Sequence, residues 1–395
     1  MTDLSSDIKT ELNEELKNII QYWKANSVDE KHGGFLGKRD HFNKEVPYAN
    51  KGAILNTRLL WTFSAIENFQ TDDSCRKLAE RAYDYLKKYF YDEEYKGIFW
   101  ELDYKGNPVN RRKQIYAQAF AIYALTEYYK LTNDRDALKF ANDLFFLIEN
   151  HARDREKNGY LEAFQQDWSP IEDMRLSEKD DNSAKTMNTH LHILEAYTNL
   201  FIVTEDTSVK GALINLIELF LEKFLDAKNM HFQLFFNTNW QRANNNVSYG
   251  HDIEAVWLII EACKAVGSKK FLEKAEIVAI EVAEVFLKEA YVQNAGVINE
   301  KDLDSGKVDE DRHWWPQVEA MVGLDYAFKI SGEKKFLLAK KDIWEYTKQH
   351  IKDHAHGEWY FRVDKNNNPY ETEDKLSMWK APYHNSRACM MLLKN

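Results

Sequence analysis

Apolar residues recur along the chain at the helical spacing i, i+3, i+4 and i+7, and almost no segment alternates apolar and polar positions as a strand does. This spacing predicts helices of two kinds. Helices with charged residues along one face are expected at residues 6–25, 73–90, 134–150, 208–226, 268–289 and 334–352. Helices that are apolar around most of their circumference are expected at residues 52–67, 113–130, 186–203, 248–265, 315–330 and 382–393. Because amphipathic helices suit a surface and all-round apolar helices suit an interior, the pattern predicts outer and inner helices in strict alternation.

A short segment with glycine and aromatic residues stands between each outer helix and the inner helix that follows it. Gly34, Gly97 and Gly159 are 63 and 62 residues apart, and Gly296 and Gly357 are 61 residues apart. The chain therefore repeats a unit of about 60 residues six times. Helix pairs of this kind bury a shared core by packing side by side, and six pairs can close into a ring. We expect an all-α fold, an (α/α)6 barrel of six outer and six inner helices, with short hairpins at one mouth.

Composition is consistent with a single domain that spans residues 1–395. The 44% of apolar residues and 14% of aromatic residues are spread evenly from end to end. The chain has no low-complexity linker that would mark a domain boundary.

Charge and cysteine usage narrow the class of partner. The net charge is −11, and no cluster of Lys and Arg stands without acidic neighbours, which excludes a phosphate-backbone partner. The first twenty residues are acidic and amphipathic, unlike a secretory signal, and no stretch has the roughly 20 apolar residues of a membrane span. We expect a cytoplasmic monomer that binds a small molecule, with neither nucleic acid nor membrane as partner. Three cysteines match no disulfide or zinc pattern: Cys75, Cys263 and Cys389.

Candidate chemistry concentrates in the first two turns of the inner helices. If the hairpins precede these helices, all six N-terminal ends meet at one mouth. They carry Arg58, Tyr116, Asn188, His190, His192, His251, Glu254, Trp314, Trp315, Glu319, Trp379 and His384. A helix N-terminus is electropositive, which disfavours imidazolium and keeps histidine neutral and basic.

Each of these residues also has a purely structural interpretation. A single histidine near a helix start is more often a satisfied polar group, and the tryptophans suit the core as well as a sugar-stacking platform. The two glutamates suit a helix dipole as well as an orienting role, in which each would hold an imidazole in one tautomer. The convergence of at least three histidines from different helices favours an acid–base site.

Other chemistries find less support in the residue pattern. His190 and His192 are two positions apart on a helix and point in different directions, and no HExxH or similar metal-ligand spacing occurs. The chain has no P-loop and no GxGxxG motif after a strand. A glycosidase would need two opposed carboxylates, whereas this mouth presents opposed histidines. The pattern predicts proton transfer at carbon, with no metal and no cofactor.

Five segments carry a resemblance to a known family: KGAILNTRLLWTFSA, MNTHLHILEAYTNL, SYGHDIEAVWLI, HWWPQVEAMVG and WKAPYHNSRAC, in that order. Over essentially the whole chain, the sequence resembles the cellobiose 2-epimerase branch of the N-acylglucosamine 2-epimerase superfamily. The resemblance implies an (α/α)6 barrel without metal or redox cofactor. It also implies reversible inversion at C2 of the reducing-end glucose of β-1,4-linked disaccharides such as cellobiose and lactose.

The resemblance also implies roles for individual residues. His251 and His384 match the two acid/base histidines of the family, and His192 matches a third that assists near O1 and O2. Asp180 matches a further polar contact. Sugar-contacting or orienting positions are matched by Arg58, Tyr116, Asn188, Glu254, Trp314, Glu319 and Trp379. The last motif departs from the family pattern, which has Cys and Gly where Ala381 and Ser386 stand.

Inversion at C2 requires the open-chain aldehyde, because the C2 proton is acidic only beside a carbonyl. One imidazole would remove this proton and the opposite imidazole would return one to the other face, while Arg58 and His192 stabilise charge on O1 and O2. Pro382 would start the last helix and aim His384 at the substrate. Three alternatives remain: an aldose–ketose isomerase of the same superfamily, an N-acylglucosamine 2-epimerase, and a sugar- or protein-binding barrel without catalysis.

Overall fold

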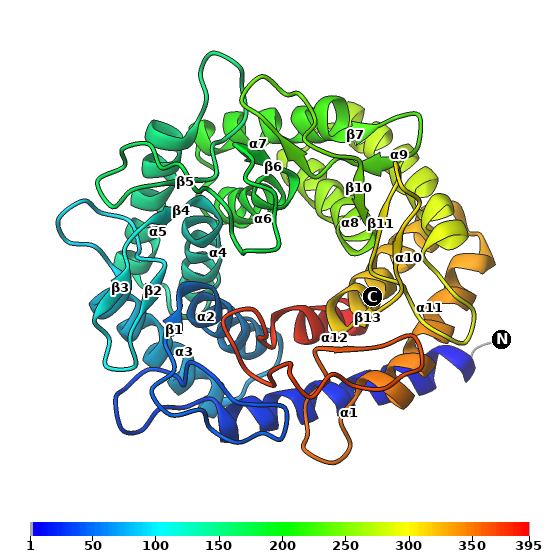
Figure 1. Ribbon diagram of the computed structural model, residues 1–395, viewed down its shortest axis with the longest axis horizontal. Coiled ribbons are helices and arrows are strands. Elements are labelled where there is room, and N and C mark those ends of the chain that lie inside the picture. Colours follow the sequence, from blue (N-terminus) through cyan, green and yellow to red (C-terminus); the bar gives the residue numbers. More distant parts are fainter. Residues whose placement is uncertain (1–2, 395) are drawn as a thin grey trace.

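A closed ring of inner helices forms the centre of the protein in the computed structural model, which describes residues 3–394 (Figure 1). The inner helices are α2 (Ala53–Phe69), α4 (Ile115–Thr132), α6 (Met187–Thr204), α8 (Tyr249–Val266), α10 (Trp314–Ser331) and α12 (Tyr383–Lys394). Each packs against its neighbours in this order, and α12 packs against both α10 and α2. The ring is therefore closed.

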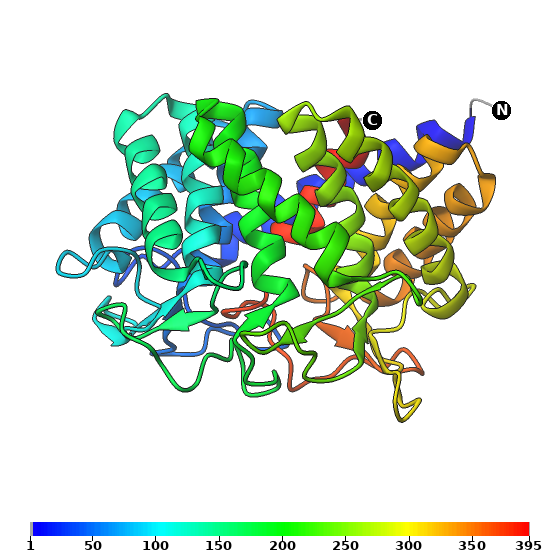
Figure 2. The same cartoon turned by 90° about the horizontal axis from the view of Figure 1, so that it is seen from above.

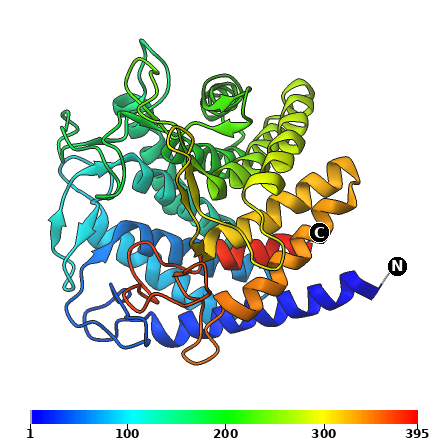
Figure 3. The same ribbon diagram turned by 45° about the vertical axis from the view of Figure 1, so that its right-hand side comes forward.

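A second ring of helices surrounds the first. The outer helices are α1 (Asp3–Asn26), α3 (Asp73–Tyr85), α5 (Arg135–Leu147), α7 (Thr207–Leu219), α9 (Lys269–Glu289) and α11 (Lys334–Tyr346). The outer helices α3, α5, α7, α9 and α11 each pack on the inner helix that precedes them in the chain. Helix α1 packs on α12, and this contact joins the two ends of the chain (Figure 3). The predicted (α/α)6 barrel is confirmed.

The inner and outer helices differ in burial as their sequences predict. In α2, every residue from Ala53 to Ile66 is buried, because the helix faces the ring interior on one side and the outer helices on the other. In α3, the buried residues are confined to one face: Cys75, Ala79, Ala82, Tyr83 and Tyr85. Among residues 3–394, no helix combines the length and the apolar character needed to cross a membrane.

Four outer helices end differently from the prediction of continuous helices to about residues 90, 150, 226 and 352. Each changes into a π-helical segment: η1 (Leu86–Phe90), η2 (Ile148–Ala152), η3 (Phe220–Phe224) and η4 (Thr347–Ile351). The N–H of Tyr91, for example, donates to the carbonyl oxygen of Leu86 at 3.2 Å, five residues earlier. A single wide turn of this kind leaves the apolar periodicity almost unchanged, so the sequence pattern does not reveal it.

Short strands and long loops gather at one mouth of the barrel, where the inner helices begin (Figure 2). The strands are β1 (Lys51–Gly52), β2 (Glu101–Leu102), β3 (Pro108–Asn110), β4 (Lys113–Gln114), β5 (Ala163–Phe164), β6 (Lys185–Thr186), β7 (Leu225–Asp226), β8 (His231–Phe232), β9 (Phe235–Phe236), β10 (Asn246–Ser248), β11 (Glu300–Asp302), β12 (Val308–Asp309), β13 (Arg312–His313) and β14 (Arg362–Val363). The predicted mouth is therefore present.

The strands pair across units, and not only within the hairpin of one unit as the sequence had suggested. The strand that precedes an inner helix pairs antiparallel with a strand of the next unit: β1 with β2, β4 with β5, β6 with β9, β10 with β11 and β13 with β14. Two or three residues form too few hydrogen bonds to hold a strand alone. Cross-pairing therefore links consecutive units at the mouth.

Buried ion pairs fix the start of several inner helices. An aspartate in the turn after an outer helix accepts a hydrogen bond from a lysine just before the inner helix of the same unit. The pairs are Lys51 with Asp29 at 2.8 Å, Lys113 with Asp92 at 2.7 Å and Lys185 with Asp154 at 2.7 Å. All three lysines are buried. Such pairs contribute little net stability, but each defines one position of the turn relative to the helix.

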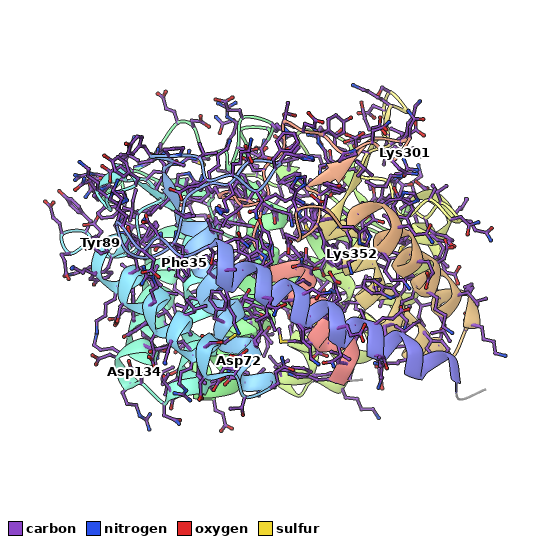
Figure 4. All side chains as sticks on the ribbon, turned by 90° about the horizontal axis from the view of Figure 1, so that it is seen from below. Phe35, Asp72, Tyr89, Asp134, Lys301 and Lys352 are labelled. Carbon is purple, nitrogen blue, oxygen red and sulfur yellow. The ribbon has the colours of Figure 1, made fainter. Side chains whose placement is uncertain are left out.

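The opposite end of the barrel has short turns closed by helix caps. Asp72 accepts hydrogen bonds from the backbone N–H groups of Ser74 and Cys75 at the start of α3, and Asp134 accepts one from Asp136 at the start of α5. Figure 4 shows Asp72 and Asp134 at the edge of the molecule away from Lys301, which lies on β11. The long loops, and with them the candidate site, lie at the other end.

Candidate active site

The side chains at the fourth and the sixth residue of the inner helices point in opposite directions. The fourth residue of four helices bonds to the backbone of the preceding hairpin: Gln118 to Ile98, His190 to Tyr160, Asp252 to Phe232 and Gln317 to Val297. The sixth residue of five helices faces the ring interior: Arg58, Phe120, His192, Glu254 and Glu319. Two residues correspond to about 200° around a helix, which separates the two sets.

His190 is a structural residue. Its Nε2 accepts a hydrogen bond from the backbone N–H of Tyr160 at 2.9 Å, and its Nδ1 lies 2.6 Å from the carbonyl oxygen of Thr186. Burial lowers the pKa of His190 to about 3. The sequence counted His190 among the residues of the mouth but predicted that it points in a different direction from His192, and the structure confirms the different directions.

A cavity of about 160 Å³ lies at the mouth end of the ring axis. It is lined by Arg58, Tyr116, Asn188, His192, His251, Glu254, Trp314, Trp315, Phe361, Trp379 and His384. All residues to which the family resemblance assigned a role are in this set, except Asp180 and Glu319. We call it the reaction cavity.

His384 is held by a carboxylate behind it. Its Nδ1 lies 2.7 Å from Oε1 of Glu319, and both side chains are buried. The hydrogen bond places the proton on Nδ1 and leaves Nε2 as the free nitrogen. Burial, first, and the cations Arg58 and Arg387 hold the pKa of His384 well below its ordinary value. Glu319 therefore orients the imidazole and lies outside the cavity.

His251 has a weaker partner. Its Nδ1 lies 2.8 Å from the hydroxyl oxygen of Ser248, the residue that precedes α8. Burial, with a smaller contribution from His192, lowers the pKa of His251 to about 3. The sequence attributed neutral imidazoles to the helix dipole. In the structure, burial is the leading cause.

His192 and Arg58 are both anchored on the far side of the cavity. The Nδ1 of His192 lies 3.0 Å from Oε2 of Glu195, three residues further along α6. Arg58 donates from Nη2 to the hydroxyl of Tyr116 at 3.0 Å and from Nη1 to the carbonyl oxygen of Trp379 at 3.2 Å. Its guanidinium lies 4.6 Å from the ring centre of Phe120. A permanent positive charge is thus fixed beside the cavity.

Beneath the cavity, Arg387 joins three buried glutamates, a group that sequence reasoning missed. Its Nη2 donates to Oε1 of Glu254 at 2.6 Å and to Oε1 of Glu319 at 2.7 Å, and its Nη1 donates to Oε1 of Glu195. Arg387 is 3% exposed. One guanidinium therefore partly neutralises three carboxylates.

A spacing in the sequence signals this group. An ionisable residue follows each histidine of the reaction cavity after three positions: His192 and Glu195, His251 and Glu254, His384 and Arg387. Residues three apart share one helix face, so each histidine on the ring interior has a charged neighbour one turn deeper.

The charge of the glutamates follows from burial and from Arg387. Burial and then the neighbouring Glu319 raise the pKa of Glu254 to about 7. Its Oε2 is buried without a hydrogen-bond partner among the described residues, and Glu254 lines the cavity. This oxygen therefore keeps an unused acceptor next to the cavity. For Glu195, Arg387 and His192 outweigh burial and lower the pKa to about 2.

Asp180 lies in a second, larger cavity of about 300 Å³ outside the first. Asn188 and His251 line both cavities, so the two adjoin. Asp180 Oδ2 accepts hydrogen bonds from the backbone N–H and the hydroxyl of Ser177, both at 2.9 Å. The structure therefore places Asp180 outside the reaction cavity, in the adjoining cavity that His251 also lines, where a ligand that extends beyond the reaction cavity would pass.

The predicted tryptophans differ in exposure. Trp314 is 3% exposed and lies under Lys380, whose Nζ is 4.8 Å from its ring centre. Trp379 is half-buried, with its ring centre 5.9 Å from that of Trp100, and forms a wall of the cavity. Trp314 therefore belongs mainly to the core, and Trp379 suits a platform.

The two departures from the family pattern are both buried close to this wall. Ala381 is 1% exposed, and the hydroxyl of Ser386 donates to the carbonyl oxygen of Pro382. Neither residue lines the reaction cavity. Both act through packing.

Two groups among residues 3–394 have the donor types of a metal site. In the first, formed by Glu254, Glu319 and His384, the two carboxylate oxygens already accept from Arg387, so a guanidinium takes the position of a cation. The second is formed by Asp309, Asp311 and His313. Both oxygens of Asp311 are bonded there, one to Arg362 at 2.8 Å and one to Tyr370 at 3.1 Å.

Comparison with known proteins places this geometry in a family. Residues 34–388 match the family described as N-acylglucosamine 2-epimerase (GlcNAc 2-epimerase). The cellobiose 2-epimerase of Bacteroides fragilis is 45% identical, and that of Dictyoglomus turgidum is 39% identical, each over 98% of both chains. The solved structure of cellobiose 2-epimerase from Bacillus thermoamylovorans is 40% identical, with a TM-score of 0.91 over 98% of this chain and 99% of that one. The match extends over nearly the whole chain, and the chain therefore belongs to the N-acylglucosamine 2-epimerase family.

Proposed function

We propose that this protein catalyses reversible C2 epimerisation of the reducing-end glucose of β-1,4-linked disaccharides, such as cellobiose and lactose, to mannose. One observation carries the proposal: two imidazoles, the buried His384 and the partly exposed His251, come from different helices to one cavity, each with Nδ1 engaged by a residue of the protein. The names of the relatives that are 45% and 39% identical support the disaccharide substrate.

The reaction begins with the open-chain aldehyde, since only the carbonyl makes the C2 proton acidic. The free nitrogen of one imidazole removes that proton and leaves a cis-enediolate. Arg58 and His192 stabilise the charge on O1 and O2. The other imidazole, protonated on Nε2, then gives a proton to the opposite face of C2. Glu319 accepts the Nδ1 hydrogen bond of His384 and so stabilises its protonated form.

Purified protein incubated with cellobiose and followed by NMR tests the proposal. The expected product is the disaccharide with mannose at its reducing end. A ketose as the main product would identify an aldose–ketose isomerase, and turnover of N-acylglucosamine alone would identify the other epimerase branch. If neither cellobiose nor any other sugar tried is converted, the remaining alternative is a sugar- or protein-binding barrel without catalysis.

The chelator EDTA should not change this activity. The cation position between Glu254 and Glu319 is taken by Arg387, and proton transfer between C2 and an imidazole needs no metal ion. Initial rates are compared before and after dialysis against EDTA. A loss of rate that zinc or manganese restores would contradict the expectation.

Trp379→Ala should lower kcat/KM for cellobiose about ten-fold, which corresponds to roughly 1.4 kcal/mol of lost stacking. The half-buried ring forms a wall of the cavity, so the barrel should keep its unfolding temperature. Trp379→Phe, which retains an aromatic face, is the matched control and should lose less. A large fall in unfolding temperature for Trp379→Ala would instead make Trp379 a core residue.

We also propose a monomer in the cytoplasm as the working form. One chain supplies both imidazoles together with Arg58 and His192 to the reaction cavity, which fits a monomer. The three cysteines are unpaired and buried, which fits a reducing compartment. Size-exclusion chromatography and cell fractionation test these two points.

A further inference from the structure

Trp315 lies between the two imidazoles. It is the second residue of α10, which stands between α8 and α12 in the ring (Figure 1). Its ring centre is 4.8 Å from that of His251, with the planes at 54°, and 5.5 Å from that of His384, with the planes at 38°. Among the described residues, no other ring contacts both histidines.

The indole occupies space that a glycine leaves open. A Cβ atom on Gly250 would lie 2.4 Å from Cη2 and 2.6 Å from Cζ3 of Trp315, and 3.0 Å from Cγ of Pro316. Only glycine allows the edge of the indole to approach the first turn of α8 so closely. The edge of the Trp315 indole therefore packs directly on the first turn of α8, the helix that carries His251.

Within the described part of the chain, each imidazole has a single hydrogen bond, on Nδ1. One such bond defines the tautomer and one distance, but it leaves the ring free to tilt about that bond. The indole of Trp315 packs against both rings at these tilted angles, and this contact restrains the tilt of both imidazoles. The position of Nε2 above the substrate therefore depends on the indole as well as on Ser248 and Glu319.

The tilt has a chemical consequence. Protonation of a cis-enediolate at C2 gives the epimer or the starting sugar, whereas protonation at C1 gives the ketose. The two carbons are neighbours, so a displacement of about 1 Å in the proton donor changes which one receives the proton, and such displacements can cost about 100-fold in rate.

We propose that Trp315 is a positioning residue that sets the separation and tilt of His251 and His384 and thereby directs the returning proton to C2 instead of C1. The inference rests on the epimerase function proposed above. According to this inference, the single indole that contacts both bases determines the preference for epimerisation over isomerisation.

Three variants test the inference. Trp315→Ala removes the indole, Trp315→Phe keeps a smaller aromatic face, and Gly250→Ala displaces the indole without removing it. Trp379→Ala is the matched control, because it removes an indole from the same cavity without a ring contact to either base. The measurement is the ratio of ketose to epimer at early conversion of cellobiose, read by NMR, together with kcat and KM.

For Trp315→Ala we expect kcat to fall about 10- to 100-fold with KM changed less than about three-fold, and the ratio of ketose to epimer to rise at least about five-fold. Gly250→Ala should shift the ratio in the same direction, Trp315→Phe should restore most of it, and Trp379→Ala should keep the wild-type ratio. A wild-type ratio in both Trp315→Ala and Gly250→Ala would overturn the inference, as would an equal shift in Trp379→Ala. If Trp315→Ala does not fold, the ratios of ketose to epimer in Gly250→Ala and Trp315→Phe test the inference in its place. Wild-type protein that forms no epimer would overturn the proposed function itself, and the inference with it.

Discussion

In D2O, the wild-type protein should place deuterium at C2 of the epimerised disaccharide, and His251→Ala and His384→Ala should each lose net epimerisation by about 10²- to 10⁴-fold or more. The deuterium is expected because the proton that returns to C2 comes from an imidazole that exchanges with solvent. The loss is expected because without one imidazole the enediolate cannot be protonated on that face.

The imidazole that remains can still remove and return a proton on its own side. Each variant should therefore retain, at most, slow exchange at C2 in only one of the gluco and manno sugars. The sugar that exchanges should differ between His251→Ala and His384→Ala. NMR of both sugars, incubated separately in D2O, measures this directly.

His190→Gln is the matched control, because it removes a buried imidazole from the same region without touching the reaction cavity. Gln occupies the same helix position in α4 and α10, where Gln118 and Gln317 bond to the neighbouring hairpin. Epimerisation should therefore stay near the wild-type rate. Near-normal epimerisation in either alanine variant, or wild-type product without deuterium at C2, would show that two-base transfer is wrong.

Arg387→Met should destabilise the barrel by about 3–5 kcal/mol, because it leaves buried carboxylates without their cation. Arg387 bonds to Glu195, Glu254 and Glu319, all of them nearly inaccessible to water. Activity should fall as well, since Glu319 would no longer be held in place behind His384. Urea unfolding of variant and wild type measures the difference in stability.

The stability lost in Arg387→Met should depend on pH in a defined direction. Burial already raises the pKa of Glu254 to about 7 with Arg387 in place, and the variant should raise it further. A carboxyl whose pKa in the folded protein lies above its unfolded value of about 4.3 does not lower the free energy of unfolding at a pH where it is neutral in both states. It lowers the free energy of unfolding most at a pH above its folded pKa. The destabilisation should therefore be larger at pH 8 than at pH 5. Equal losses at both values would mean that Arg387 acts by packing alone.

The order and limits of the helices were predictable from sequence because burial imposes a local period. An inner helix is buried on nearly all sides, so its apolar run identifies it: the expected 248–265 compares with Tyr249–Val266. The repeat of about 60 residues then predicts a ring, because identical neighbours pack in identical ways. The π-helical ends of the outer helices leave no such mark.

The sequence by itself thus determined the barrel, its mouth and most residues of the reaction cavity, since these follow from helix period, repeat length and the family motifs. Only the tertiary structure decided which side chains meet at the reaction cavity. His190 and His192 differ by two positions, and the facing direction of each depends on how α6 sits in the ring. The partners of Arg387 lie 68, 133 and 192 residues away in sequence, and Trp315 meets both bases only because α10 stands between their helices. Such contacts depend on the closure of six units into a ring, a long-range property that no local pattern of apolar and polar residues encodes.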